Sequence, residues 1–170
     1  MSNEHHLVIA RALRRVDEKD LDSIVALNNQ YEIWMARKDR SFFEIHKDIP
    51  FFYVIEHEKT ILGFAMVTDW RPRYDSLLHR WFAERFPKFY YIDRIVIERD
   101  HRRKGLGSRL YNIIITDARA YPLMCEVAIE PENTESLRFH EKFGFETIGE
   151  YSCYGKTFRM LRLARLQESR

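Results

Sequence analysis

The segment RDHRRKGLGSRLY, at residues 99–111, combines consecutive basic side chains with two closely spaced glycines. Glycine lets a backbone approach a ligand without a Cβ in the way, and successive N–H groups that lead into a helix bind anions. Basic side chains add charge-assisted hydrogen bonds to a phosphate. We interpret the segment as a pyrophosphate-binding loop made of Arg102, Arg103, Lys104, Gly105, Leu106, Gly107 and Ser108.

Other interpretations compete for this loop. A dinucleotide-binding turn has the same strand–turn–helix context, and Glu126 lies about 20 residues on, as that fingerprint requires. However, Leu110 occupies the place of its third glycine. A P-loop is excluded because G-x-x-x-x-G-K-[ST] does not occur in this stretch. The plainest alternative is a solvated basic turn that only caps a helix.

The elements that must position this loop follow from hydrophobic periodicity. Apolar residues recur at helical spacing after the loop, whereas runs rich in β-branched and aromatic residues indicate strands. Asp17 and Asn133 are expected helix N-caps, and Gly144 is expected to end the second of these helices. We expect strands at 6–14, 51–57, 61–70, 89–98, 123–129, 145–155 and 156–163, and helices after Asp17, at 105–120 and at 133–143.

This order predicts an α/β fold in which a mixed sheet carries helices on both faces. Strand 89–98, helix 105–120 and strand 123–129 form a right-handed βαβ unit, so the loop lies at the carboxyl end of a central strand, where such sheets bind ligands. The aromatic segment 71–88 is an insert between strands. It is either a satellite core beside the first helix or a wall of the substrate pocket, whose arginines would suit a carboxylate.

The composition fits one globular domain over residues 1–170. Hydrophobic residues make up 45% and charged residues 32%, and the net charge of +2 is too small for bulk nucleic-acid binding. The 2 cysteines, the lack of a signal-peptide pattern and the lack of a membrane-length apolar run favour a reducing, intracellular setting. We therefore expect a cytoplasmic protein without nucleic-acid or membrane partners, and a homodimer stays open.

The loop and a second motif together resemble the GNAT superfamily of N-acetyltransferases. Arg102-x-x-Gly105-x-Gly107 after a strand is similar to the superfamily's coenzyme A pyrophosphate loop, and PENTESLRFHEKFGFE at 131–146 is similar to its second landmark. The resemblance covers residues 89–163, and YIDRIVI, CEV and N-x-x-S-x-x-F-H are similar to one poorly characterised branch of predicted acetyltransferases. It implies the GNAT fold, acetyl-CoA as the acetyl donor, no metal, and an amine acceptor on either a small molecule or a protein.

The resemblance also implies how the acetyl donor is held. A backbone N–H on the central strand binds the thioester carbonyl, the pantetheine arm lies between two splayed parallel strands, and an asparagine contacts the arm. That asparagine can equally be a plain N-cap, and both roles are compatible. The matching residues are Ile95, Val96 and Ile97 for the carbonyl, and Asn133 with Ser136 for the arm.

Transfer to an amine needs a base, because an amine of pKa about 10 is mostly protonated at pH 7. Asp93 and Glu126 lie inside apolar strands, where an ionised carboxylate is costly unless it is paired or functional. The family more often has its glutamate where this chain has Ala128, and Asp93 has the alternative of an ion pair with a neighbouring base. The family's usual acid, a tyrosine, is replaced by His140, whose alternative is a surface histidine.

We therefore expect an acetyl-CoA-dependent N-acetyltransferase in which the amine attacks the thioester directly in a ternary complex. The alternative from another class is a non-catalytic module that binds acyl-CoA on the same fold. The histidine at position 140 and the unsettled base are the features that favour this alternative.

Overall fold

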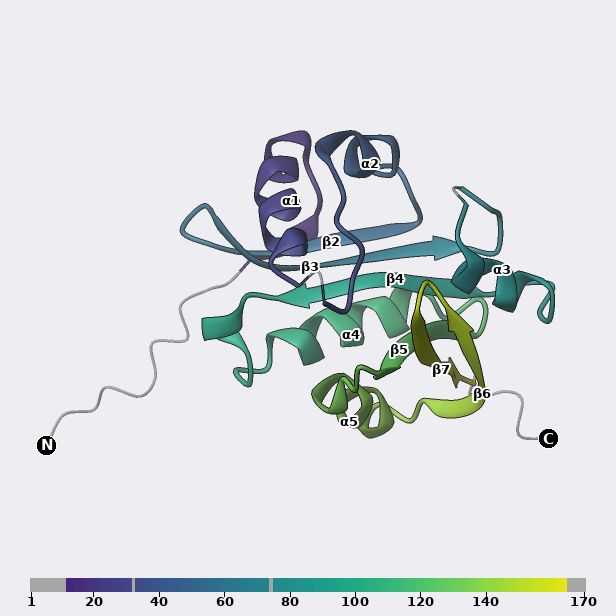
Figure 1. The fold of residues 1–170 in the computed structure, drawn as a ribbon. Helices are drawn as coiled ribbons and strands as arrows, with labels where there is room; N and C mark the ends of the chain where they lie inside the picture. Colours follow the sequence, from purple (N-terminus) through teal and green to yellow (C-terminus); the bar gives the residue numbers. More distant parts are fainter. Residues whose placement is uncertain (1–11, 32, 74, 165–170) are drawn as a thin grey trace, which may run out of the picture.

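The computed structural model describes residues 12–31, 33–73 and 75–164, which form a seven-stranded sheet with helices on both faces (Figure 1). The strands are β1 Ala12–Arg15, β2 Phe51–His57, β3 Thr60–Asp69, β4 Tyr90–Ile97, β5 Leu123–Glu130, β6 Glu146–Cys153 and β7 Lys156–Leu163. The α-helices are α1 Leu21–Asn29, α2 Arg40–Ile45, α3 Leu77–Ala83, α4 Leu106–Asp117 and α5 Thr134–Lys142, and two 3-10 helices are η1 Glu18–Asp20 and η2 Arg99–His101.

The strand order β1-β2-β3-β4-β5-β7-β6 makes the sheet mixed, as predicted. Neighbouring strands are antiparallel except β4 and β5, which are parallel and joined through α4. These two strands pair only at Tyr90 with Leu123 and at Tyr91 with Met124. Because both pairs lie at the start of the strands, β4 and β5 are open toward their carboxyl ends.

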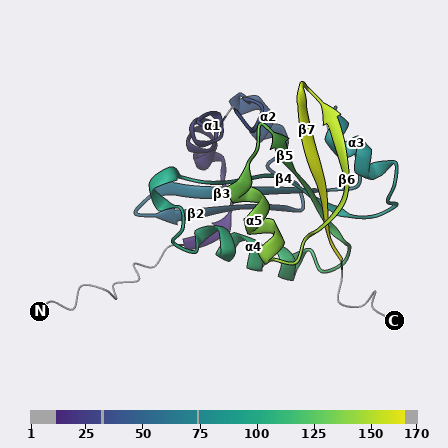
Figure 2. The ribbon, with the colours of Figure 1, turned by 60° about the horizontal axis from the view of Figure 1, so that its bottom comes forward.

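The helices divide between the two faces of the sheet. Helices α1 and α2 cover one face, and α4 lies on the other (Figure 1 and Figure 2). The apolar stripe predicted after the glycine loop is buried at Leu106, Leu110 and Ile114. On the opposite face, Leu21 and Ile24 of α1 pack in a separate core with the aromatic side chains of β2 and β3.

The insert between β3 and β4 forms a third apolar cluster, so it is a satellite core, but its predicted place beside the first helix is wrong. Phe82 of α3 and Phe89 are fully buried in it. They pack with Tyr91, Met124 and Met160, which belong to β4, β5 and β7. The insert therefore covers the second half of the sheet rather than lying beside the first helix.

Two further differences from the sequence prediction concern the N-terminal half. The predicted strand at 6–14 lies mostly outside the described residues, and its described part runs in β1 from Ala12 to Arg15. Helix α2 was not predicted, because it is only 6 residues long and buries a single side chain, Phe43. Asp17 caps η1, which leads directly into α1, so the predicted helix start is confirmed.

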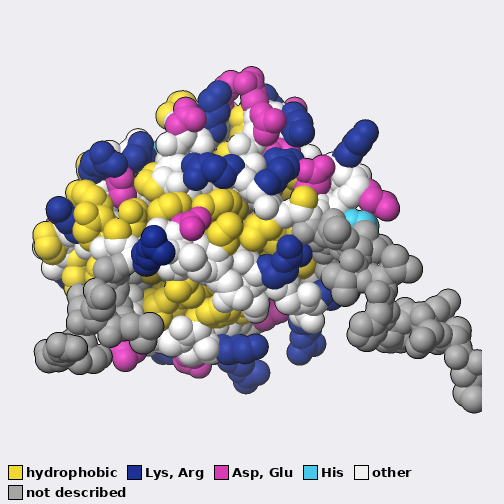
Figure 3. Space-filling model, turned by 180° about the vertical axis from the view of Figure 1, so that it is seen from behind, with side chains coloured by type: hydrophobic (Ala, Val, Ile, Leu, Met, Phe, Trp, Pro, Cys, Tyr) yellow, Lys and Arg dark blue, Asp and Glu magenta, His cyan; other side chains and the backbone are white. Residues whose placement is uncertain are grey.

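The molecular surface mixes apolar and charged side chains. Viewed from behind, a band of hydrophobic side chains crosses the surface, and basic and acidic groups are interspersed along it (Figure 3). No helix in the described part of the chain is long and apolar enough to cross a membrane.

Candidate active site

The site is built where β4 and β5 separate. Beyond the first two residue pairs, no further pairing joins these strands. In β4, Asp93 is an extra residue between the pairs that Ile92 and Arg94 make with β3. Such a bulge turns neighbouring backbone and side-chain groups out of the regular ladder. The bulge therefore lies at the edge of the opening, one strand away from Glu126.

The glycine loop connects β4 to α4 in the conformation that an anion site needs. The φ angles of Arg103 and Gly105 are 58° and 78°, and Gly105 is the N-cap of α4 without a side-chain capping bond. The first N–H groups of α4 thus have no side-chain cap from this residue, and the positive end of the helix dipole favours an anion there. The exposed side chains of Arg103 and Lys104 lie next to these groups in the chain.

Arg102 has a different position from its two basic neighbours. Its Nε donates to the Ile97 carbonyl at 3.2 Å, and its Nη1 lies 3.5 Å from Glu135 of α5. The guanidinium also lies over the Tyr31 ring, 4.5 Å from its centroid. In this arrangement, Arg102 links the end of β4 to α5 and to the residues after α1.

Gly107 serves the packing of two helices. A Cβ at this position would lie 3.2 Å from the Phe139 ring of α5, which is closer than a normal contact. Glycine is therefore required at these two positions of the loop for different physical reasons. Gly105 provides a left-handed backbone, whereas Gly107 allows α4 and α5 to approach each other.

The residues expected to contact the acetyl donor lie along the same opening. Val96 is buried on the α1 face, and Ile95 and Ile97 are half-buried on the α4 face, so their main chain follows the free edge of β4. Asn133 caps α5, because its Oδ1 accepts a hydrogen bond from Ser136 N at 3.2 Å. The plain capping role of Asn133 is thus present in the structure.

Glu126 has the most perturbed carboxyl group of the site. Burial is the main cause that raises its pKa from 4.5 to about 8, and the negative charge of Asp93 raises it further. A hydrogen bond from the Tyr91 side chain and the charge of Arg94 act in the opposite direction. Its Oε2 is buried and has no hydrogen-bond partner. A half-buried carboxyl with a pKa near neutrality is suited to accept a proton from an amine.

Asp93 lies in a charged cluster beside Glu126. Its Oδ1 is 3.5 Å from Arg94 Nε, and both side chains are almost inaccessible to solvent. Arg94 also donates through Nη1 to Asn28 Oδ1 at 2.9 Å and to the Ala36 carbonyl at 3.2 Å. The ion-pair alternative for Asp93 is therefore present, with the adjacent Arg94. Arg94 in turn holds the connection between α1 and α2.

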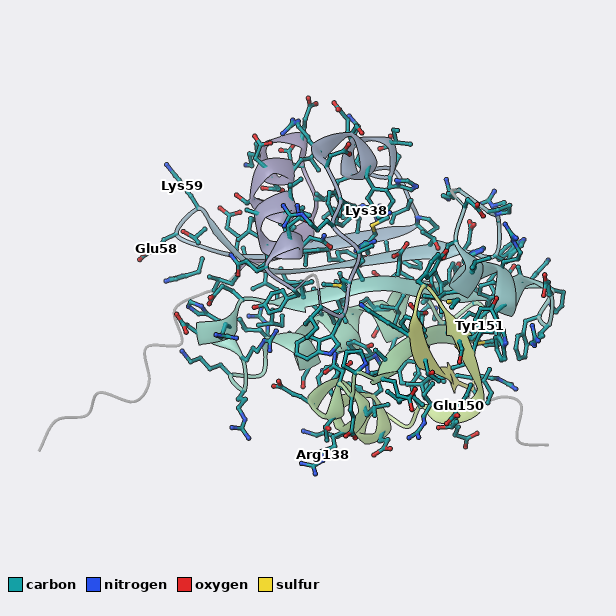
Figure 4. The ribbon with its side chains drawn as sticks, in the orientation of Figure 1. Lys38, Glu58, Lys59, Arg138, Glu150 and Tyr151 are labelled. Carbon is teal, nitrogen blue, oxygen red and sulfur yellow. The ribbon has the colours of Figure 1, made fainter. Side chains whose placement is uncertain are left out.

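Lys38 adds a cationic group on that connection, above β3 and β4 (Figure 4). Burial lowers its pKa below the usual range, and the charge of Arg94 lowers it further. Its Nζ lies 4.4 Å from the centroid of the Phe42 ring. Neither Lys38 nor Arg94 was singled out from the sequence, since no local motif marks them. Only the fold brings Lys38 close to Asp93 and Arg94 into contact with Asn28 and Ala36.

His140 is located in the core between α4 and α5. It is 3% exposed, so the surface alternative for it is wrong. Its Nδ1 lies 2.7 Å from the Ser136 carbonyl, and its Nε2 is hydrogen-bonded to the Tyr111 hydroxyl. Burial lowers its pKa to about 4, against a weaker opposing effect of the Ser136 bond. At pH 7 the imidazole is neutral, and its one proton, on Nδ1, is only weakly acidic and is donated to the Ser136 carbonyl, so this position disfavours the acid role.

Comparison with known proteins agrees with this geometry. Residues 18–145 match the acetyltransferase (GNAT) family. The L-methionine sulfoximine/L-methionine sulfone acetyltransferase of Pseudomonas aeruginosa is 28% identical over 173 residues, and the match covers 94% of each chain. The L-amino acid N-acyltransferase MnaT of Escherichia coli is 30% identical over 116 residues, covering 67% of this chain and 61% of MnaT.

Solved structures share the fold at lower sequence identity. The putative acetyltransferase yncA from Salmonella typhimurium, solved with its cofactor acetyl-CoA, has a TM-score of 0.69 at 20% identity, with 91% of this chain and 93% of that chain covered. Chaetomium thermophilum Naa20, solved with a bisubstrate analogue, has a TM-score of 0.73 at 18% identity, with coverage of 91% and 86%.

Proposed function

The chain belongs to the GNAT family of acetyltransferases, whose acetyl donor is acetyl-CoA. We propose that it acetylates the primary amine of a free amino acid. We further propose that Glu126 is the base for this transfer. The observation that carries the proposal is the half-buried Glu126 carboxyl, with a pKa of about 8 and an unpartnered Oε2, in the strand opposite the bulge of β4.

The residues around the opening fit acetyl-CoA. The unpaired edges of β4 and β5 offer main-chain groups to a pantetheine arm, because the ladder between them stops after two pairs. The uncapped N-terminus of α4 and the exposed Arg103 and Lys104 suit a pyrophosphate. The bound thioester supplies an activated acetyl group. We assign the loop from Arg102 to Ser108, the main chain of 95–97, and Asn133 with Ser136 to its binding.

Glu126 would remove the proton that an incoming ammonium group carries. At pH 7 its carboxyl, with a pKa of about 8, is ionised in about a tenth of the molecules. The concentration of the active, ionised form is thus about 10-fold below the total. In return, the raised pKa makes each ionised carboxylate a stronger proton acceptor. Asp93 contributes by its charge, which raises the pKa of Glu126.

The proposed acceptor class is supported by the relatives and by the shape of the site. Two relatives are named for amino acids or amino-acid analogues as acceptors. In this chain, the connection between α1 and α2 is joined to the start of β7, because Lys156 Nζ donates to the Ile33 carbonyl at 2.5 Å. The Lys156 side chain thus links β7 to the α1–α2 side, which favours a small acceptor over a peptide.

Acetyl transfer to a panel of amines tests this function directly. Thiol release from acetyl-CoA is expected with free L-amino acids or their sulfone and sulfoximine analogues, and much less with peptides that begin with the same residue. Thermal stability should rise with coenzyme A and not with NAD, since only a ligand of the native state stabilises it. Tight coenzyme A binding without turnover on any amine would instead support a non-catalytic acyl-CoA-binding module.

A further inference from the structure

An indole N–H on the connection between α1 and α2 is buried and has no hydrogen-bond partner. It is Nε1 of Trp34. A buried donor without a partner destabilises the native state, so native proteins contain few of them and each one needs an explanation. A ligand that accepts this hydrogen bond is one such explanation.

The segment that carries Trp34 is held firmly in place. The carbonyl of Ile33 accepts from Lys156 of β7, and the carbonyl of Ala36 accepts from Arg94 of β4. The Trp34 main-chain N–H itself donates to the Tyr31 carbonyl at 3.0 Å. Because contacts from two strands fix the residues on both sides, the unpartnered Nε1 belongs to an ordered segment rather than to a loose loop.

Trp34 packs on the same side of the sheet as the proposed base. It joins the apolar cluster that contains Met124 and Ala128, the residues that flank Glu126 on the same face of β5. Glu126 Oε2 is itself a buried hydrogen-bond acceptor without a partner. Among its buried groups without a hydrogen-bond partner, this side of the opening therefore offers a carboxyl acceptor and an indole donor. A small molecule with an amine and an oxygen atom complements both.

We propose that Trp34 is a specificity-determining residue, whose Nε1–H donates a hydrogen bond to an oxygen of the amine substrate. This inference rests on the proposed function, and it adds a second point of recognition to the amine at Glu126. The oxygen belongs either to the α-carboxylate of an amino acid or to a polar side chain, and the two sources share the chemistry of a hydrogen-bond acceptor.

The test removes only the N–H and compares three acceptors. Trp34→Phe keeps an aromatic ring and loses the donor. The acceptors are L-methionine sulfone, L-methionine, which lacks the sulfone oxygens, and 3-(methylsulfonyl)propylamine, which lacks the carboxylate. We expect Trp34→Phe to lower kcat/KM by about 10-fold or more for acceptors that carry the recognised oxygen. The loss should shrink to less than about 2-fold for the one analogue without it, and the KM for acetyl-CoA should stay unchanged.

The analogue on which the loss disappears identifies the oxygen as carboxylate or sulfone. An equal loss on all three acceptors, or no loss on any, overturns the proposal. Trp81→Phe is the matched control, because Trp81 is a partly buried indole that packs against the same cluster. It should affect the three acceptors equally.

Melting of the ligand-free protein gives a second readout that needs no acceptor. Since the N–H has no partner in the protein, its removal costs no hydrogen bond, so Trp34→Phe should melt no more than about 4 °C below the wild type, which is the loss expected from the smaller ring alone. A decrease of more than about 4 °C would show a structural role and overturn the inference. If the wild type acetylates none of the three acceptors, the proposed acceptor class fails, and the melting comparison still decides whether the donor is held for a ligand.

Discussion

Replacing Glu126 with Gln should change activity and stability in opposite directions. The wild-type carboxyl is the proposed base, and Gln has nearly the same shape but cannot accept the proton. General-base catalysis contributes about 10²- to 10⁴-fold to such reactions. We expect Glu126→Gln to lower kcat by at least about 100-fold while the KM for acetyl-CoA changes little, because the residue lies apart from the pyrophosphate loop in the chain.

The effect on stability follows from the pKa. The native carboxyl keeps its proton up to about pH 8, whereas the unfolded chain releases it at the ordinary value of 4.5. The native state therefore binds more protons between these values, and the free energy of unfolding falls as the pH rises through this window. The full difference corresponds to about 5 kcal/mol. Because the Glu126 residue is half-buried rather than fully enclosed, we expect its titration to lower the free energy of unfolding by only about 2 to 3 kcal/mol over this pH window.

The assay combines pH–rate profiles with urea unfolding at pH 4.5 and pH 8.5. The wild-type kcat/KM should rise with pH to a limit above about pH 8, and Glu126→Gln should lack this rise. In urea, Glu126→Gln should be more stable than the wild type at pH 8.5 but not at pH 4.5. Glu130→Gln is the control on the same strand, since Glu130 is exposed and accepts a hydrogen bond from Thr157 Oγ1 at 3.1 Å. Wild-type activity and an unchanged profile in Glu126→Gln would refute the assignment of the base.

Three further changes test the surroundings of the site. His140→Ala should lower the free energy of unfolding by about 3 kcal/mol, because it leaves buried partners unsatisfied; urea unfolding and kcat per folded molecule should separate this from an acid role, for which kcat would fall instead. Asp93→Asn should move the rise of kcat/KM to lower pH, because the Asp93 charge raises the pKa of Glu126; a shift to higher pH would contradict this coupling. Gly107→Ala should destabilise the protein by about 1 to 2 kcal/mol through contact with Phe139, and thermal melting should show recovery when Phe139→Leu is added.

The sequence predicted those parts of the fold that depend on local patterns. The strand and helix order, the cap at Asn133 and the glycine after α5 all follow from residues close together in the chain, and the structure has them. Helix α2 is too short for a periodic pattern. The packing of the insert depended on contacts with β5 and β7, which lie far along the chain.

The site residues were predictable only where a sequence motif, or a charged residue inside an apolar run, marked them. An acidic residue inside an apolar strand pointed to Glu126 and Asp93, and the glycine spacing pointed to the loop. Arg94, by contrast, looks like any polar residue of a strand, and its ties to Asn28 and Ala36 exist only after folding. The burial of His140 was also out of reach, because it depends on how closely α4 and α5 approach.

The short ladder between β4 and β5 divides the sheet into two parts that the main chain barely connects. What spans the division on the α4 face is side chains: Phe139 against Gly107, and His140 between Tyr111 and Ser136. These contacts set the distance between the two parts of the sheet, and hence the width of the opening between β4 and β5. His140, at the position of the family's usual tyrosine, thereby contributes to the spacing between the two parts of the sheet.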